Sequence, residues 1–321
     1  CTYQLFEKAG LPAGGINMVG ANGPDFGRTV LSRSELAGVH FTGSTPTFQW
    51  IWKTVSENLG RYRTYPRLVG ETGGKDFVFA HPSADAQALT TALIRGSFEY
   101  QGQKCSAASR AYIPRSIWKS IQSPLVEQAR ELKVGDVRDF RNFVNAVIDE
   151  RSFKKISGYL EQAGRDSKVN VLAGGKGDAR KGYFIEPTLL ETSDPHYRTM
   201  VDELFGPMLS IYVYEDAQVE EALKLCETSS PYGLTGAVFS QDRAELDRMS
   251  RVLRHAAGNF YINDKPTGAV VAQQPFGGGR ASGTNDKAGS PLNLYRWFSP
   301  RTIKETLEPP KDYRYPFLAE Q

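Results

Sequence analysis

Short apolar runs alternate with amphipathic stretches along this chain of 321 residues. Residues 38–41 and 67–70 are apolar runs next to glycine, which is typical of short buried strands. A helix is predicted between them, beginning near Pro46, because proline suits the first helical turn. Its apolar stripe at helical spacing is Phe48, Trp52, Val55 and Leu59. The first 70 residues therefore indicate a strand, a helix and a strand in succession.

The same alternation continues toward the C-terminus. Residues 77–79 predict a strand, and Ser83 or Asp85 can cap the helix after it. The inner face of that helix is predicted to hold Leu89, Leu93 and Phe98. Residues 209–214 alternate between aliphatic side chains and Ser or Tyr, which predicts a half-buried strand. The pattern ends with a helix after Asp216, a strand near residues 236–239, a helix after Asp242 and a strand at residues 260–262. Strands that alternate with helices predict an α/β fold.

Composition narrows the class of function. Hydrophobic residues make up 40% and charged residues 23%, which is ordinary for a soluble globular protein. The net charge is +3, from 39 basic and 36 acidic residues, and no basic run forms a patch, which argues against a nucleic-acid partner. No apolar run approaches the roughly 20 residues of a membrane-spanning helix. These features favour a small-molecule partner.

Cys1, Cys105 and Cys226 are too far apart in sequence for a zinc motif, and an odd number cannot all pair within one chain. The four histidines are equally scattered, so no metal site is predicted. This usage of cysteine is typical of a reducing, intracellular compartment. Cys226 shares a helical face with Val219 and Leu223, which predicts a buried structural thiol.

The turn after the first strand is a candidate anion site. Residues 42–46 read Thr-Gly-Ser-Thr-Pro and lead directly into the predicted helix. Free N–H groups and the positive end of the helix dipole favour anions at such a position. Many similar turns bind nothing, however, and the chain has neither a G-x-G-x-x-G nor a G-x-x-x-x-G-K-[ST] motif. The turn alone does not establish a nucleotide site.

Glu71 ends the second predicted strand and is followed by Thr-Gly-Gly-Lys. Open α/β sheets place active groups at the carboxyl ends of their strands, which favours a functional carboxylate here. A solvated loop glutamate is the alternative interpretation, and the local pattern does not decide between the two.

Cys105 lies in a run of small residues after a predicted helix, and Lys104 precedes it. Small neighbours leave a thiol approachable, and a nearby cation with free N–H groups would favour the reactive thiolate. We therefore expect an activated nucleophile at this position. No histidine is close in sequence, so a Cys–His hydrolase has little support, although a distant histidine partner stays open.

Several of these segments occur together in one known superfamily. The shared segments are residues 41–44, 71–75, 102–105, 203–207 and 275–278. Their order and rough spacing resemble the aldehyde dehydrogenase superfamily over the whole chain. Residues 98–107, 258–265 and 283–286 resemble in particular its mitochondrial 1-pyrroline-5-carboxylate (glutamate-semialdehyde) dehydrogenase branch. The chain would correspond to the C-terminal portion of such an enzyme.

The resemblance implies catalytic and cofactor roles. Cys105 would attack the aldehyde carbon, and Glu71 would activate the water that hydrolyses the resulting thioester. NAD would be the hydride acceptor. The implied cofactor contacts are Gly43, Ser44, Thr45, Pro46 and Thr47 with the pyrophosphate end, Glu203 with the nicotinamide ribose and Phe205 with the nicotinamide ring.

The resemblance implies substrate contacts as well. The family holds the carboxylate of glutamate semialdehyde with the residue after the nucleophile and with a glycine-containing turn, which correspond here to Ser106, Gly268 and Ala269. Some relatives carry serine where this chain has Ala269, so one hydroxyl contact is lost while backbone N–H donors remain. Phe276 would line the aliphatic part of the pocket, although simple core packing is an open alternative for this ring.

The domain organisation is a further expectation from the resemblance. Residues 1–70 would be half of a Rossmann-like NAD-binding domain, residues 71–286 the catalytic domain and residues 287–321 an oligomerisation segment. A homodimer or higher homo-oligomer in the mitochondrial matrix is implied. The family's upstream cofactor half, with an oxyanion-hole Asn and a ribose-binding Lys, does not precede Cys1, so we expect the chain alone to bind NAD weakly. A truncated, non-catalytic structural or binding subunit is the alternative.

Overall fold

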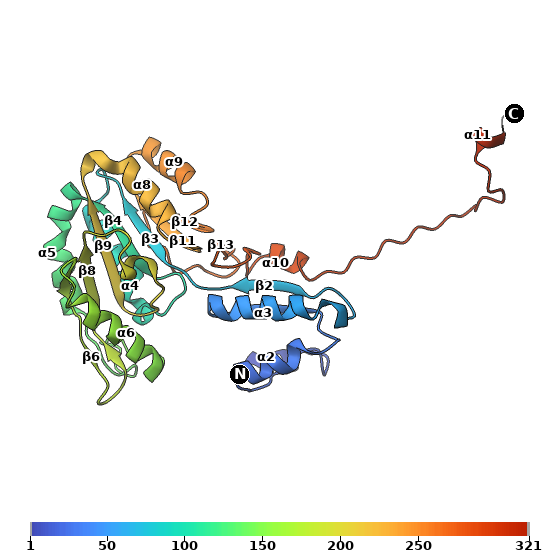
Figure 1. Cartoon of the computed structure of the whole chain (residues 1–321), viewed down its shortest axis with the longest axis horizontal. Helices are drawn as coiled ribbons and strands as arrows, with labels where there is room; N and C mark the ends of the chain where they lie inside the picture. The colour runs from blue at the N-terminus through green and yellow to red at the C-terminus, as the bar shows by residue number, and fades with distance from the viewer. Residues whose placement is uncertain (1, 320–321) are drawn as a thin grey trace.

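The computed structural model describes residues 2–319, so Cys1 lies outside the described residues. The strands of its main sheet are β3 (Asp76–Ala80), β4 (Ala108–Pro114), β5 (Val169–Ala173), β8 (Thr188–Thr192), β9 (Met208–Tyr214), β11 (Thr235–Phe239) and β12 (Asn259–Ile262). They lie in the order β12-β11-β3-β4-β9-β8-β5 (Figure 1). All neighbours are parallel except β5, which runs antiparallel to β8. The predicted α/β fold is confirmed.

Helices cover both faces of this sheet. They are α4 (Ala86–Phe98), α5 (Arg115–Glu131), α6 (Glu150–Ala163), α8 (Val219–Thr228) and α9 (Arg243–Val252). The first two pack on one face and the other three on the opposite face, so Val78 of β3 contributes to one core cluster and Phe79 to the other. Asp85 and Asp242 are the N-caps of α4 and α9 and accept backbone N–H groups through their side chains, so both helices begin where the sequence predicts.

β9 differs from its prediction. The alternation along residues 209–214 indicates one buried and one exposed face, but Ser210 and Tyr214 are buried as well. The reason is that helices cover both faces, and the polar atoms of this strand are satisfied internally. Ser210 donates to Thr199 Oγ1 at 2.7 Å, and the Tyr214 hydroxyl donates to the carbonyl oxygen of Ala80.

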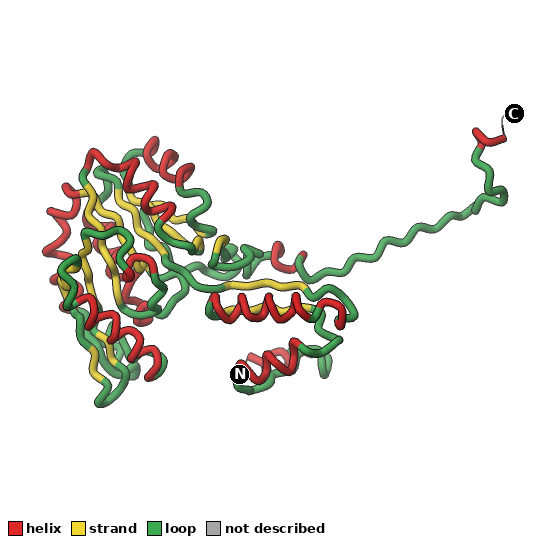
Figure 2. The backbone as a smooth tube through the Cα atoms, viewed as in Figure 1, coloured by secondary structure: helices red, strands yellow, loops and turns green. Residues whose placement is uncertain are grey.

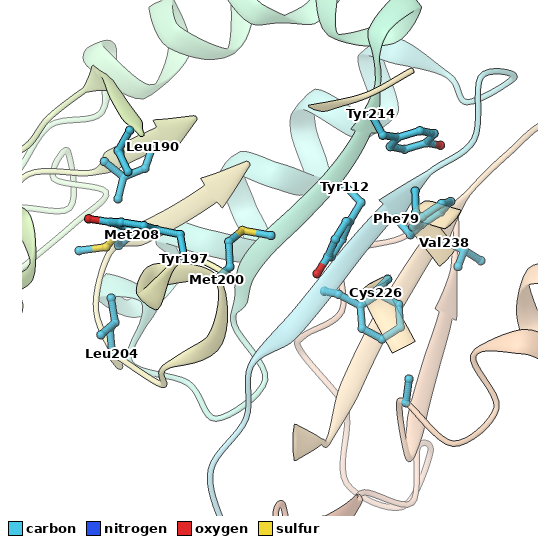
Figure 3. Packing of buried hydrophobic residues seen from close by; sticks show 14 of the residues in the cluster. Phe79, Tyr112, Leu190, Tyr197, Met200, Leu204, Met208, Tyr214, Cys226 and Val238 are labelled. Carbon is cyan, nitrogen blue, oxygen red and sulfur yellow. The ribbon is translucent and has the colours of Figure 1, made fainter. Parts of the chain in front are cut away.

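Figure 3 shows part of the core on the face covered by α6, α8 and α9. Phe79 stacks with both Tyr112 and Tyr214, with ring centroids 6.2 and 5.5 Å apart. Cys226 on α8 is fully buried in the same cluster. Its predicted burial is therefore confirmed, and desolvation raises the pKa of its thiol to about 12.

A thinner N-terminal layer precedes the main sheet. Its elements are α1 (Thr2–Lys8), α2 (Gly23–Leu31), β1 (Gly38–Thr42), α3 (Thr45–Glu57) and β2 (Arg67–Glu71). β1 and β2 pair in parallel as a separate two-stranded sheet, and α3 runs alongside them (Figure 1). Both strands and the helix between them were predicted. Six buried apolar residues of this layer form one small cluster, which is Leu31, Leu36, Phe48, Ile51, Val55 and Leu68; Val69 of β2 is buried as well.

The apolar stripe predicted for α3 is partly wrong. Its buried face runs through Ile51, whereas Trp52 and Leu59 are exposed. Leu59 lies beyond the end of the helix, in a short 3₁₀ turn (Leu59–Arg61). Trp52 points off the face that packs toward β2, and it contacts the edge of the Phe48 ring instead.

One returning segment joins the N-terminal layer to the main sheet. The backbone of Glu71 pairs with Gly283, and the N–H of Thr284 donates to the Gly70 carbonyl oxygen at 2.9 Å. Just after β2, the N–H of Thr72 donates to the backbone carbonyl oxygen of Ser282 at 2.9 Å. The carboxyl end of β2 is thus fixed from both sides before the chain enters β3.

The remaining elements are short: β6 (Gly177–Asp178), β7 (Phe184–Ile185), α7 (Arg198–Val201), β10 (Tyr232–Gly233), β13 (Gly279–Arg280), α10 (Pro291–Tyr295) and α11 (Pro316–Ala319). Beyond α10 the chain extends away from both layers (Figures 1 and 2), and residues 301–318 are exposed throughout. No helix within residues 2–319 combines the length and apolar character needed to cross a bilayer. The predicted domain boundaries at residues 70 and 286 stay predictions.

Candidate active site

A cavity of about 850 Å³ opens between the N-terminal layer and the main sheet. It brings together ten residues predicted from the sequence, which are Gly43, Ser44, Glu71, Cys105, Ser106, Glu203, Phe205, Gly268, Ala269 and Phe276. Thr45, Pro46 and Thr47 do not line it, because they form the first turn of α3 behind Ser44. Among residues 2–319, no group of three or more His, Cys, Asp or Glu side chains could hold a metal ion.

Cys105 follows an unusual stretch of backbone. Tyr100, Gln101 and Gly102 all have left-handed φ angles, between 55° and 62°. A Cβ at Gly102 would lie 2.4 Å from the carbonyl oxygen of Gly206, so only glycine fits there. The Gln101 side chain accepts a hydrogen bond from the N–H of Asn145 at 3.2 Å. These contacts fix the loop that carries the thiol to the cavity.

The expectation of a thiolate at Cys105 is wrong for this structure. Lys104 turns away from the thiol and donates to Glu99 Oε2 at 2.9 Å. Desolvation, with the nearby carboxylates of Asp76, Glu71 and Glu203, raises the pKa of the Cys105 thiol to about 12. The sequence places a cation beside the cysteine, but the fold pairs that cation with Glu99 and buries the thiol near three carboxyl groups.

Glu71 is buried at the carboxyl end of β2 and lines the same cavity as Cys105. Neither of its carboxylate oxygens has a hydrogen-bond partner among residues 2–319. Desolvation raises the pKa of Glu71 to about 7, although the ammonium of Lys287 opposes the shift. A carboxyl group with a pKa near neutrality can accept a proton from water and release it again. The structure therefore favours the functional interpretation of Glu71 over the solvated loop.

Glu203 sits against the two glycines that follow Glu71. Its Oε1 accepts a hydrogen bond from the N–H of Gly74 at 3.0 Å, and a Cβ at Gly73 would lie 2.4 Å from Oε2. Lys155 on α6 donates to the backbone carbonyl oxygen of Glu203 at 2.7 Å. Burial raises the pKa of the Glu203 carboxyl. The Gly-Gly pair thus serves to let this carboxylate approach the backbone.

The residues at this end of the cavity fit a dinucleotide. Ser44 caps the 13-residue helix α3, and its hydroxyl oxygen accepts the N–H of Thr47 at 3.3 Å. The positive end of the helix therefore meets the cavity at Gly43 and Ser44, where a pyrophosphate is favoured. Thr45 bonds inward instead, to Ala281 at 3.0 Å. The carboxylates near Cys105 suit a cationic ring.

The opposite end of the cavity carries hydroxyl groups and cations. Ser106 and Thr267 share a hydrogen bond of 2.8 Å, and both side chains are buried. Gly268 follows with a φ of +93°, which favours glycine. A Cβ at Gly268 would lie 3.5 Å from the ammonium of Lys265, which donates to Glu99 Oε2 at 2.6 Å. Polar and charged groups of this kind suit an anionic substituent.

Four residues of this site were not predicted from the sequence: Lys155, Lys265, Thr267 and Lys287. Thr267 stands directly before Gly268, so its position beside the predicted turn was the available signal. Lys265 ends the segment 258–265 that carries the family resemblance, but no role was assigned to it, and Lys155 and Lys287 gave no signal. The three lysines reach the site from different segments, and their spacing follows no local period.

Proteins of similar sequence point to the same family as the geometry of the cavity. The sequence profile described as "Aldehyde dehydrogenase family" matches residues 1–303. The chain is 50% identical over 318 residues to "Delta-1-pyrroline-5-carboxylate dehydrogenase, mitochondrial" of Danio rerio, covering 99% of this chain and 57% of that protein. It is 51% identical over 317 residues to the Homo sapiens protein of the same name, covering 98% and 56%.

Solved structures give the same result. The structure of "Delta-pyrroline-5-carboxylate dehydrogenase from Mycobacterium tuberculosis bound with NAD" superposes with a TM-score of 0.92 at 53% identity, covering 99% of this chain and 58% of that one. A 1-pyrroline-5-carboxylate dehydrogenase from Thermus with bound NAD has a TM-score of 0.85 at 32% identity, covering 92% and 55%. The chain thus spans a little over half the length of these relatives. It belongs to the aldehyde dehydrogenase family.

Proposed function

We propose that the natural protein carrying this chain oxidises L-glutamate 5-semialdehyde to L-glutamate with NAD as the acceptor. One observation carries the proposal: Cys105 and Glu71 line a single cavity, between a helix N-terminus at one end and a cationic, hydroxyl-lined turn at the other. The names of the curated relatives and the NAD-bound structures support both the substrate and the cofactor.

The chain's own residues divide the reaction between them. The Cys105 sulfur bonds to the aldehyde carbon and the thiol proton passes to the aldehyde oxygen, which gives a tetrahedral hemithioacetal; that hydroxyl proton is released to water when the hydride leaves. NAD supplies the acceptor for the hydride that leaves this carbon, which becomes a thioester. Glu71 then takes a proton from water, whose oxygen bonds to the thioester carbon as the C–S bond breaks. The products are glutamate and the free thiol. Burial, with the nearby carboxyl groups of Asp76, Glu71 and Glu203, raises the pKa of the Cys105 thiol and favours its protonated form before the substrate binds.

Charge at the far end of the cavity supports a dicarboxylate product. Arg95, Lys104 and Lys265 all donate to Glu99, so three cations surround a single carboxylate. Burial disfavours the ionised form of Glu99, but these hydrogen bonds lower its pKa to about 2. The cluster keeps a surplus of positive charge, and its Lys265 ammonium lies 3.5 Å from where a Cβ at Gly268 would be, so it attracts the substrate carboxylate toward that turn. Ser106, Thr267 and the turn at Gly268 would hold that carboxylate.

The oligomer and the compartment are also proposals. We propose a homodimer or higher homo-oligomer in the mitochondrial matrix. The exposed segment beyond α10 supports the homo-oligomer, because it carries apolar side chains that a second copy could cover: Ile303, Leu307, Tyr313, Tyr315 and Phe317. The word "mitochondrial" in the names of the relatives supports the compartment.

The test is NADH formation by the natural protein with glutamate semialdehyde and with an aliphatic aldehyde of similar length. We expect a clear preference for glutamate semialdehyde, and loss of activity by about a thousandfold or more in Cys105→Ser, because an alcohol is a far weaker nucleophile. Cys226→Ser is the matched control and should keep most of the activity. Equal rates with both aldehydes would remove the substrate proposal. Absence of NADH with any aldehyde would favour the non-catalytic alternative.

A further inference from the structure

Lys287 joins two segments behind Glu71. Its ammonium donates to the carbonyl oxygens of Gly258 at 2.8 Å and Gly277 at 3.1 Å. These two glycines touch: a Cβ at Gly258 would lie 1.9 Å from the Gly277 carbonyl oxygen. Lys287 itself adopts a left-handed φ of 52°, an uncommon conformation for a residue with a side chain. A half-buried lysine in this conformation is held by its surroundings.

The segment bound by Lys287 is also the segment that meets Glu71. A Cβ at Gly277 would lie 2.9 Å from Glu71 Oε1, so the carboxylate packs directly on this backbone. The loop that carries Lys287 frames Glu71 on the other side as well, through the pairing of Glu71 with Gly283. Lys287 therefore affects the Glu71 carboxylate in two ways: it fixes the backbone on which the carboxylate packs, and its positive charge acts on the carboxylate.

The other charged groups near Glu71 do not supply this positive charge. Asp286 adds a negative charge, and its carboxylate is already engaged by the Thr284 hydroxyl and lies 3.7 Å from the Arg296 guanidinium. The Cys105 thiol faces Glu71 across the cavity, and ionisation of either group disfavours that of the other. Within residues 2–319, Lys287 is the cation that acts on the Glu71 carboxyl.

We propose that Lys287 is a positioning residue that holds Glu71 against Gly277 and favours its carboxylate form, so that Glu71 can act as a base at neutral pH. The inference rests on the proposed function and deepens it. Burial and two charged side chains set the ionisation of Glu71. Desolvation raises its pKa to about 7, Lys287 lowers it and Asp286 raises it. Loss of the ammonium must therefore raise the pKa of Glu71, and loss of the Asp286 charge must lower it.

The experiment compares Lys287→Met, which keeps the length of the side chain, with Lys287→Arg in the natural protein. Thioester hydrolysis follows the ionised fraction of Glu71, so its rate rises with pH through the pKa. In Lys287→Met we expect this rise to move to higher pH by about half a unit or more, with a several-fold lower rate at neutral pH that recovers at alkaline pH. The initial burst of NADH should be unchanged. Lys287→Arg should keep the original profile, and Asp286→Asn should shift it the opposite way.

A fall of the rate at every pH without a shift of the midpoint would overturn the proposal, because it would show that Lys287 only supports the fold. An unchanged profile in Lys287→Met would overturn it equally. A readout that needs no turnover separates this result from the proposed function. Infrared difference spectra, with Glu71→Gln to assign the carboxyl band, should show protonated Glu71 persisting to higher pH in Lys287→Met. If that shift occurs while no aldehyde is oxidised, the proposed function fails and the inference on Lys287 stands.

Discussion

The main sheet and the N-terminal layer contribute to one cavity but differ greatly in packing. Seven strands with helices on both faces give the main sheet two extensive core clusters, in which Phe77, Val78 and Leu93 are fully buried. The N-terminal layer has two strands and, within residues 2–71, seven buried apolar residues, six of which form its core cluster. Many of its apolar side chains are exposed, namely Leu5, Phe6, Met18, Val19, Phe26, Trp50 and Trp52. The two regions therefore differ in how tightly they pack around the residues that they contribute to the cavity.

The division of chemistry follows the division of packing. Cys105, the proposed nucleophile, comes from the well-packed region, on a loop that has left-handed backbone and a side-chain hydrogen bond at Gln101. The helix N-terminus at Ser44 comes from the thin layer. Glu71 stands at the boundary, fixed by the returning residues 281–284. The comparison teaches that the thiol is carried by the rigid region, while Glu71 and the helix N-terminus depend on a layer that has few internal contacts and is held at its end by the returning segment.

Glu71→Gln should give the largest effect on catalysis, because it removes the one proton acceptor at the boundary. We expect a burst of NADH followed by turnover slower by about 10² to 10⁴-fold, since the amide cannot take a proton from water. Rapid-mixing kinetics measure the burst, and mass spectrometry should find an acyl group on Cys105. Glu57→Gln, exposed at the end of α3, is the control. Loss of the burst itself would mean that Glu71 acts earlier, on the thiol.

Matched leucines test the difference in packing directly. Leu93→Ala in the main sheet region should lower the free energy of unfolding by about 3–5 kcal/mol, because the surrounding core cannot collapse into the cavity. Leu31→Ala in the N-terminal layer should cost about 2 kcal/mol, because its neighbours are few and can relax. Denaturant titrations of the two variants give both values. Equal losses would show that the layer is packed as tightly as the main sheet.

Two serines at opposite ends of the cavity should give smaller and separable effects. Ser106→Ala should raise KM for glutamate semialdehyde by roughly tenfold, because a buried hydrogen bond to a charged group is lost. Ser44→Ala should raise KM for NAD by about fivefold, because the cap of α3 is lost. Ser56→Ala on the same helix is the control for the second change. If each variant altered both constants equally, the two ends would not act independently.

Much of the fold was predictable, and the reasons are local. Strands at β1, β2, β3, β11 and β12 were predicted because each is a short apolar run next to glycine or a turn. The region between β4 and β8 gave no such prediction. α5 contains Pro124 and many charged residues, and β5 carries exposed side chains at an edge, so neither shows a clean period.

The candidate site divides in the same way. The motif residues Glu71, Cys105 and Glu203 do line one cavity, although their roles stay predictions. Their ionisation was not predictable, because the sequence shows Lys104 beside Cys105 and cannot show that its ammonium faces Glu99. The pKa of a group in a folded site depends on which charged side chains point toward it, and adjacent residues in a loop often point in different directions.

The three left-handed residues before Cys105 have a consequence for altering this cavity. Gly102 lies against the carbonyl of Gly206, and Gly206 adjoins Phe205 in the cavity wall. The backbone of the loop that carries the thiol is therefore in direct contact with the backbone at Gly206, and neither segment can shift without displacing the other. Ala269 and Phe276 also line the cavity, and the Phe276 backbone is held by one hydrogen bond, from its N–H to the Ala288 carbonyl oxygen at 2.9 Å. Redesign toward bulkier aldehydes should begin at those two positions and leave the stretch from Tyr100 to Cys105 untouched.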